Sequence, residues 1–264
     1  SAGGLLSAQT AKLKPVLSLM SGPSGGVIST SYFGKLEKIK NLIAFDMGGT
    51  STDVCAIIDN KPKLTADSIL EGYPVMVPTL DVHSIGAGGG SIAFIDSVGS
   101  FNVGPLSAGA SPGPVCYSKG GTNPTVTDAN CILGRVAPSK YLPSNLKLNT
   151  KLAKKIIQEK IAKPLKLNNF KAAAGIIEIC NLKMSNAVRS ITIEKGLDPS
   201  EFTLCAYGGA GPMHACWIAK QLGIPKVVIP IAPGQFSALG ILLGQVRHDL
   251  VRTISVNENY NAIE

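Results

Sequence analysis

The 264 residues predict a single α/β domain in which strand hairpins come first and helices alternate with strands afterwards. Hydrophobic residues make up 45% of the chain and charged residues only 16%, which is enough apolar material for a sizeable core. Some segments repeat apolar residues at helical spacing, and others are short β-rich runs. Glycine occurs 29 times, which implies many tight turns or close backbone contacts.

The first part of the chain predicts one helix followed by strands. Apolar residues recur at helical spacing within 21–39. The β-rich runs Leu42–Phe45 and Val54–Ile58 flank a glycine loop, so we expect an antiparallel pair. A third strand is expected within Ile69–Val77, and a glycine loop in 81–96 should lead into another.

The segment 97–170 is predicted to be an insertion within the domain. Its first part, 99–125, is rich in Gly, Pro and Ser and should be mostly loop. A short helix should follow, capped by Thr127 or Asp128. A second helix is expected over 149–162.

The last part of the chain alternates helices and strands. A long helix is expected over 170–191, because one face of it is continuously apolar. The strand Phe202–Tyr207 then meets a glycine turn that opens a helix, which should stop at Gly223. A strand at "KVVIP" and a helix of small residues over 234–245 complete the pattern.

Charge and cysteine content favour a cytoplasmic protein without nucleic-acid or membrane partners. The net charge is +8, and many lysines lie in 151–167, where no aromatic residues accompany them to stack on bases; we interpret them as a solvated helix face. The six cysteines form no CxxC pair and are expected to be buried free thiols. No apolar run reaches the roughly 18 residues that a transmembrane helix needs.

The stretch "FDMGGTSTDV" at 45–54 combines two carboxylates with glycines and hydroxyl side chains. Glycine N–H groups can approach an anion closely, and hydroxyls add donors. Asp46, at the end of a predicted strand, could hold a hydrated Mg²⁺ or orient a water. The residues that would bind phosphate are Gly48, Gly49, Thr50, Ser51 and Asp53. The alternative is a hairpin that merely turns at Gly48-Gly49.

A second glycine junction, "AYGGAGPMHA" at 206–215, again joins a strand to a helix. There Gly208 and Gly209 could let a flat ring or sugar lie against the backbone, and a helix N-terminus favours negative charge. The order of helix, strand–DxGGT–strand, long helix, strand–GG–helix and small-residue helix resembles the second lobe of the actin-like ATPases, a ribonuclease H-like fold. That resemblance implies that 46–50 clamps phosphate and that Gly208, Gly209 and Gly211 lie under the adenosine.

The motifs narrow the resemblance further, and they follow one another in the family's order over nearly the whole chain. They are "SGPSGGV", "FDMGGTSTDV", "DVHSIGAGGGSIAFID", "GPLSAGASPGPVCYSKGGTNPTVTDANCILGR", "AYGGAGPMHACWIAKQLGI" and "PGQFSALGILLGQVRHDLVRT". Together they resemble the hydantoinase A / 5-oxoprolinase family, which includes the ATPase subunit of acetone carboxylase. Residues 1–264 are therefore expected to form one hydantoinase A-type domain.

The family resemblance implies a cofactor pair, ATP and Mg²⁺, and a small cyclic amide substrate such as a hydantoin or 5-oxoproline. Its carbonyl oxygen would be phosphorylated and the ring opened by water. The chain carries one DxGGT-type loop, so it resembles a second lobe that needs the N-terminal lobe and a hydantoinase B-type subunit or domain as partners. Alternatives are the ATPase subunit of a ketone carboxylase, or a non-enzymatic actin-like module that binds nucleotide and remodels a partner.

Several other residues carry open alternatives. Asp46 is the predicted catalytic and metal-holding carboxylate. His83 could be an acid–base group or share a metal with Asp81, or it could be a structural histidine. Arg189 could stack on adenine or make a surface ion pair. The glycines of a possible second anion or substrate nest, which could equally be strained turns, are Gly86, Gly88, Gly89 and Gly90.

Overall fold

A computed structural model describes residues 3–65, 68–70, 73–75, 77–136 and 147–245. Its centre is a six-stranded mixed sheet with the order β12-β11-β1-β2-β3, and β8 also pairs with β2. The strands are β1 (Leu42–Met47), β2 (Thr52–Ile58), β3 (Lys61–Pro62), β8 (His83–Ile85), β11 (Thr203–Tyr207) and β12 (Lys226–Val228).

The pairing of β1 decides where its last residues lie. β1 runs antiparallel to β2, with Asp46 opposite Asp53, which confirms the predicted hairpin. β1 also runs parallel to β11, with Asp46 beside Tyr207. The carboxyl ends of β1 and β11 therefore share one edge of the sheet, and the glycine turn that follows each strand begins there.

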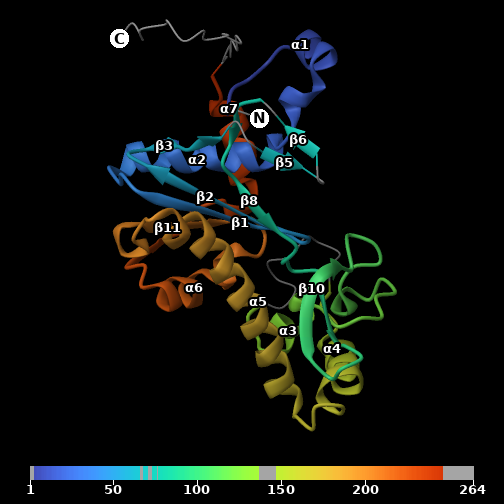
Figure 1. The fold of residues 1–264 in the computed structure, drawn as a ribbon. Coiled ribbons are helices and arrows are strands. Elements are labelled where there is room, and N and C mark those ends of the chain that lie inside the picture. Colours follow the sequence, from blue (N-terminus) through green and yellow to red (C-terminus); the bar gives the residue numbers. More distant parts are fainter. Residues whose placement is uncertain (1–2, 66–67, 71–72, 76, 137–146, 246–264) are drawn as a thin grey trace, which may run out of the picture.

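Helices cover both faces of this sheet (Figure 1). α2 (Ser21–Glu37) and α7 (Phe236–Leu243) lie on one face, and α5 (Asn169–Ile191) and α6 (Ala215–Leu222) lie on the other. Side chains alternate between the faces along each strand. The strand side chains buried under α2 and α7 are Leu42, Ala44, Cys55, Ile57, Cys205 and Tyr207, and those buried under α5 and α6 are Ile43, Phe45, Met47, Val54, Ala56, Leu204 and Ala206.

α2 and α7 cross at very close range because small residues line the contact. A Cβ on Gly240 would collide with the backbone of Gly25, and a Cβ on Gly26 would collide with the ring of Tyr207. Ser29 Oγ donates a hydrogen bond to the carbonyl of Phe236 at 2.6 Å. The small residues of α2, and those of the helix predicted over 234–245, thus have a packing role that holds the start of α7 against the end of β1.

The elements that lie between β8 and α5 in the chain form a second cluster around the N-terminal half of α5 (Figure 1). It contains β9 (Ser91–Ile95), β10 (Phe101–Ser107), α3 (Val126–Ile132) and α4 (Thr150–Ile157). The expectation of mostly loop in 99–125 is wrong at β10, which pairs with β9. The N-cap of α3 is Thr125, two residues before the first predicted candidate, and Asp128 is instead the third residue of a capping box.

Two further predictions need adjustment. The strand expected within Ile69–Val77 is two short antiparallel strands outside the main sheet, β5 (Ser68–Leu70) and β6 (Tyr73–Val75). The run contains glycine and proline, which interrupt strands. The helix expected over 149–162 is α4 followed by a π-helical turn, Gln158–Ala162. Residues 71, 72 and 76 lie outside the described part.

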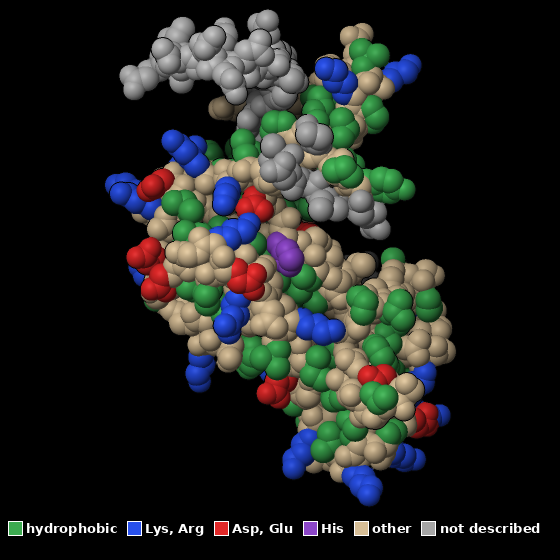
Figure 2. Space-filling view, in the orientation of Figure 1, with side chains coloured by type: hydrophobic (Ala, Val, Ile, Leu, Met, Phe, Trp, Pro, Cys, Tyr) green, Lys and Arg blue, Asp and Glu red, His purple; other side chains and the backbone are tan. Residues whose placement is uncertain are grey.

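The remaining elements are short. They are α1 (Ala8–Leu13), β4 (Leu64–Thr65), β7 (Thr79–Leu80) and the 3-10 turns Pro15–Ser18, Val115–Tyr117, Ile193–Lys195, Pro199–Glu201, Gly211–Met213 and Pro233–Gln235. Lys and Arg side chains are spread over the face shown in Figure 2, including the end of the second cluster. In the part of the chain that is described, no helix is both long and apolar enough to cross a membrane.

Candidate functional site

Asp46 lies at the point where β1, β11 and α7 meet. Ser237, in the first turn of α7, donates a hydrogen bond from Oγ to Asp46 Oδ2 at 3.0 Å. The Cα of Gly208 packs against the same carboxylate so closely that a Cβ there would collide with Oδ1. Burial raises the pKa of Asp46, while the Ser237 hydrogen bond acts in the opposite direction. The carboxylate is thus half-buried and held in one orientation.

Asp53 faces Asp46 across the β1–β2 hairpin. Burial raises its pKa too, and a hydrogen bond from Ser84 on β8 opposes the shift. The register places Ser84 opposite Asp53, so both side chains are on the sheet face that carries Asp46. Two carboxylates and two hydroxyls therefore occupy one corner of the sheet.

The turn after Asp46 is open to its surroundings. The N–H of Gly48 donates a hydrogen bond to the carbonyl of Ser51 at 3.1 Å, which fixes the shape of the turn. A Cβ on Gly48 or Gly49 would meet no atom within 4 Å, and Thr50 is exposed. Backbone N–H groups and the Thr50 hydroxyl are thus accessible to an anion on this turn.

The loop Gly86–Gly90 supports that turn from behind. The N–H groups of Gly89 and Gly90 donate to the carbonyls of Gly48 and Gly49 at 3.0 and 2.6 Å. The N–H of Gly88 donates to Ser91 Oγ at 2.8 Å. These three donors are engaged within the protein, so the arrangement favours a supporting loop over the anion nest that the glycine pattern suggested.

Thr52 is a supporting residue, whereas the sequence suggested it only as one of three hydroxyl donors to phosphate. Its buried hydroxyl donates to the carbonyl of Ala87 at 2.5 Å and so ties β2 to the same loop. The "GTSTD" motif gives Thr50, Ser51 and Thr52 the same apparent role. Only the position of Thr52 inside β2, facing the core, distinguishes it from them.

The second glycine turn, Gly208–Gly211, is in direct contact with the first. The N–H of Ala210 donates to the carbonyl of Met47 at 2.9 Å, and the N–H of Gly208 donates to the carbonyl of Pro233 at 2.9 Å. Gly208 has a φ of +80°, which side-chain-bearing residues rarely adopt. Gly209 is exposed, and a Cβ added to it would meet no atom within 4 Å. Both predicted turns therefore lie at one corner of the sheet, as a shared nucleotide requires.

His83 does not join Asp46. It pairs with Val54 in the β8–β2 ladder, so its side chain is on the α5 face of the sheet, whereas Asp46 is on the α2–α7 face. His83 is exposed there. The structure thus places the two residues that the sequence suggested separately as catalytic on opposite faces of the sheet.

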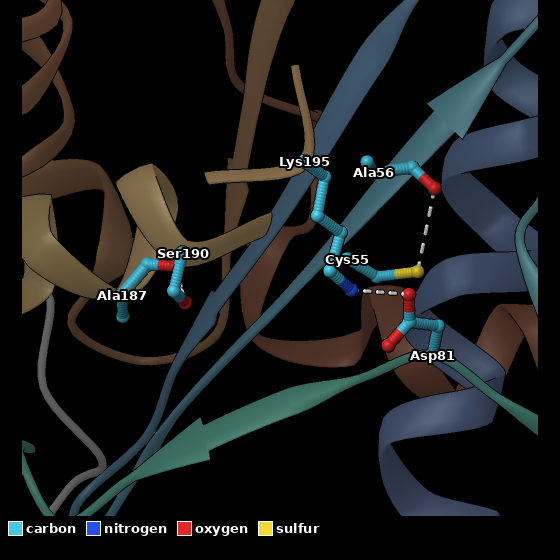
Figure 3. A network of polar contacts seen from close by, with 6 residues as sticks. All are labelled: Cys55, Ala56, Asp81, Ala187, Ser190 and Lys195. Atoms are coloured by element: carbon cyan, nitrogen blue, oxygen red, sulfur yellow. Dashed lines mark hydrogen bonds and ion pairs between the residues drawn. The ribbon is translucent and has the colours of Figure 1, made fainter. Parts of the chain in front are cut away.

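Asp81 forms an ion pair with a lysine. Lys195 Nζ and Asp81 Oδ2 form an ion pair at 2.5 Å, next to the buried thiol of Cys55 (Figure 3). The described residues contain no group of three or more His, Cys, Asp or Glu side chains that could ligate a metal ion. The predicted pairing of Asp81 with His83 therefore receives no support from this geometry.

Arg189 is exposed near the C-terminal end of α5. Within the described residues, no side-chain hydrogen bond or ion pair connects it to the turn Gly208–Gly211. Its role in adenosine binding stays a prediction.

His214 is a buried hydrogen-bonded residue at the N-cap of α6. Its Nδ1 donates to Asn181 Oδ1 at 2.6 Å, and its Nε2 accepts from Asn130 Nδ2 at 3.3 Å. Burial lowers its pKa to about 4, with nearby Arg135 adding to the shift. The neutral imidazole thus joins α3, α5 and the start of α6 directly behind the second glycine turn.

Comparison with known proteins decides the family. Residues 1–250 match the family model for hydantoinase/oxoprolinase. The chain belongs to the hydantoinase/oxoprolinase family. The resemblance inferred from the motifs is confirmed, and so is the fold class, an α/β lobe of the actin-like ATPase type with antiparallel hairpins and flanking helices.

Relatives within the hydantoinase/oxoprolinase family include two curated enzymes. The chain is 41% identical to caprolactamase subunit alpha of Pseudomonas jessenii, over 96% of this chain and 36% of that protein. It is 38% identical to 5-oxoprolinase of Dictyostelium discoideum, over 92% of this chain and 21% of that protein. The chain therefore spans about a third or less of the length of these relatives.

Solved structures of family members have the same fold. The nucleotide-free structure of acetone carboxylase superposes with a TM-score of 0.85 at 33% identity, covering 92% of this chain and 34% of that one. The ATP-dependent caprolactamase of Pseudomonas jessenii superposes with a TM-score of 0.81, covering 88% of this chain and 34% of that one.

Proposed function

We propose that the complete protein hydrolyses cyclic amides at the expense of ATP, and that this chain supplies the second half of the nucleotide site. One observation carries the proposal: the turn after Asp46 and the turn Gly208–Gly211 are hydrogen-bonded to each other through Ala210 and Met47. A nucleotide is long enough to need two such anchors. Phosphates would bind the N–H groups of 49–51 and the hydroxyls of Thr50 and Ser51, and adenosine would lie against the open Gly209.

The residues around Asp46 suit Mg²⁺. This ion prefers oxygen ligands and retains several waters, so one or two carboxylates are sufficient. Asp46 offers a half-buried oriented carboxylate, and Asp53 is opposite it in the hairpin. The bound ion would neutralise charge on the phosphates. Asp46 would hold the hydrated ion, while Ser237 keeps the carboxylate in place.

Phosphorylation of an amide carbonyl oxygen makes the carbon electrophilic and creates a good leaving group. A water can then open a ring that otherwise resists hydrolysis. This chain would position and shield the phosphates, because stabilisation of developing charge is strongest where water is excluded.

Shielding requires more than this lobe. The turn at 48–50 is open on its outer side, so we infer that an N-terminal lobe with its own phosphate loop closes over it. We also infer a hydantoinase B-type subunit or domain as the site of ring opening; the caprolactamase relative is itself named as a subunit. The six free cysteines are consistent with a cytoplasmic location.

A ketone substrate is the second candidate, because the chain superposes so closely on acetone carboxylase. Both candidate reactions would use the same nucleotide site, and they differ in the molecule that accepts the phosphoryl group, a cyclic amide or a ketone.

Turnover by the full-length protein with its partner tests the proposal. Phosphate release should depend on a cyclic amide, with 5-oxoproline, hydantoin, caprolactam and acetone compared side by side. Amide-dependent release with ring opening supports the proposal, and acetone-dependent release that consumes bicarbonate supports the alternative. ATP turnover that no acceptor stimulates would contradict both.

A further inference from the structure

Two buried cysteines of the second cluster are neighbours in space. Cys116 lies in the 3-10 turn Val115–Tyr117, and Cys131 lies in α3. Both side chains are buried, and the two thiol groups are hydrogen-bonded to each other. A pair of thiols in contact is the starting arrangement for a disulfide bond.

Asp128 attaches the turn to α3. Its Oδ1 accepts a hydrogen bond from the N–H of Cys116 at 2.7 Å, and its Oδ2 accepts one from the N–H of Val115 at 3.2 Å. Asp128 and Cys131 are three residues apart in α3, so they share one face of the helix. The backbone of Cys116 is therefore fixed against the helix face that carries Cys131, by hydrogen bonds that involve neither thiol.

The start of α4 contacts both cysteines. The N–H of Asn149, the N-cap of α4, donates to the carbonyl of Cys116 at 2.7 Å. The hydroxyl of Thr150 is 3.3 Å from Cys131 Sγ. Asn149, Thr150 and Tyr117 also line a cavity of about 610 Å³. A cavity of this size admits a molecule as small as hydrogen peroxide to the neighbourhood of Cys131.

The two thiols differ in acidity. The hydrogen bond from Cys116 holds the pKa of Cys131 below its ordinary value, and the Thr150 hydroxyl and the charge of Lys154 add to this effect against burial. The same hydrogen bond raises the pKa of Cys116, its donor. Burial raises the pKa of three other thiols to about 12, those of Cys55, Cys180 and Cys205. Among these buried thiols, Cys131 is the one most easily converted to the nucleophilic thiolate.

We propose that Cys116 and Cys131 form an oxidative modification site, at which hydrogen peroxide converts the pair to a disulfide. The thiolate of Cys131 attacks one peroxide oxygen, so that an S–O bond forms, the O–O bond breaks and hydroxide leaves. The sulfur of Cys116 then attacks the sulfenic acid at Cys131. The S–S bond forms, the S–O bond breaks, and the departing hydroxide takes the Cys116 proton and leaves as water. With the proton that Cys131 releases on ionising, one peroxide yields two waters.

The consequence for the nucleotide site rests on the proposed function. α3 carries Thr127, whose hydroxyl donates to the carbonyl of Gly89 at 2.8 Å, and Asn130, which is hydrogen-bonded to His214. These contacts support the two glycine turns from behind. An S–S bond is about 2.0 Å long, shorter than a hydrogen bond between thiols, so α3 or the turn must shift when it forms. Oxidation should therefore lower ATP turnover about 3- to 10-fold, the effect of losing one such hydrogen bond.

Peroxide treatment of the full-length protein tests the inference. The treated protein is alkylated and digested without reductant, and its peptides are mapped by mass spectrometry. We expect the peptides that contain Cys116 and Cys131 to be joined by a disulfide, and dithiothreitol to restore both thiols and ATP turnover. Cys131 oxidised to sulfinic acid without a disulfide would overturn the inference. Oxidation confined to the exposed Cys216 would overturn it as well.

Three variants assign the steps. Cys131→Ala should form no disulfide, and its ATP turnover should no longer show the reversible response to peroxide. Cys116→Ala should accumulate sulfenic acid at Cys131, which dimedone traps. Cys180→Ala removes a buried thiol from α5 and is the matched control, in which the disulfide and its effect should persist. A reversible loss of turnover that remains in Cys131→Ala would overturn the inference.

ATP turnover by the reduced protein separates this inference from the proposed function. If the disulfide forms and the reduced protein turns over no ATP with any acceptor, the proposed function fails and the modification site stands. If the reduced protein turns over ATP with a cyclic amide and peroxide produces no disulfide, the modification site fails and the proposed function stands.

Discussion

The turn at Gly48–Thr50 and the loop at Gly86–Gly90 are both glycine-rich and lie against each other, yet they differ in how much space surrounds their glycines. The first has open space beside its glycines, whereas Gly88, Gly89 and Gly90 of the second are buried and their N–H groups are hydrogen-bonded within the protein. We call the first, with Gly209, the open rim, and the second, with the His214 network, the packed support. Glycine content therefore predicts that another group approaches the backbone closely, but it does not predict whether that group belongs to a ligand or to the protein itself.

The largest effect should come from the carboxylate at the base of the open rim. Asp46→Asn preserves shape and removes the negative charge, so kcat for ATP turnover by the full-length enzyme should fall about 10²- to 10³-fold. The melting temperature should change little, because the carboxylate is only half-buried. Ser237→Ala is the matched control: it removes one hydrogen bond to Asp46 and should cost much less. Near-normal turnover by Asp46→Asn would rule out the proposed role.

The packed support should be the sterically intolerant region. A Cβ on Gly88 would lie 2.7 Å from backbone atoms of Gly49 and Thr50. Gly88→Ala should therefore lower the free energy of unfolding by about 1–3 kcal/mol, the usual cost of overpacking. Urea unfolding would measure it. Gly49→Ala, with no atom within 4 Å of its new methyl group, is the control and should cost less than 1 kcal/mol or so. Equal losses for the two variants would erase the distinction between rim and support.

The His214 network should make the support sensitive to acid. The folded-state pKa of His214 is about 4, below the ordinary value of 6.5. Between these values the unfolded chain binds a proton that the folded chain does not, so stability is full above pH 6.5 and falls as pH decreases towards 4. From pH 7 to pH 5 the loss should be about 2 kcal/mol.

Unfolding of the wild-type protein and His214→Gln at both pH values isolates this contribution, since carboxyl groups affect both proteins alike. The variant should be less stable at pH 7 and should lose less stability on acidification. A pH dependence identical to that of the wild-type protein would show that His214 is not held neutral.

The smallest effect should come from the hydroxyl on the open rim. Thr50→Val removes one exposed donor and keeps the shape. Mg-ATP affinity should fall only a few-fold, because an exposed hydrogen bond contributes about 0.5–1.5 kcal/mol. Calorimetry on the full-length protein would check this. No change at all would indicate that backbone N–H groups alone hold the phosphates.

Local patterns in the sequence predicted the elements of the sheet corner because periodicity and turn residues are local signals. The β1–β2 hairpin, the strand–turn–helix at 203–222 and the long helix α5 are examples. β10 was missed because Gly104 and Pro105 interrupt its β-rich pattern.

Side-chain partners were less predictable because they depend on strand register and on distant segments. Asp46 and His83 lie on opposite faces of the sheet, a fact set by the pairing of β8 with β2. Asp81 pairs with Lys195, more than a hundred residues away. Cys116 and Cys131 likewise meet because Asp128 attaches the turn to α3, and no CxxC spacing announces the pair.

The central claim is that one nucleotide contacts both glycine turns. Amide hydrogen exchange of the full-length protein with and without Mg-ATP tests it most directly. We predict slower exchange at 48–51 and 208–212 when nucleotide is bound, and unchanged exchange in α4 at the far end of the second cluster. Bound nucleotide that leaves both turns unprotected would contradict the claim.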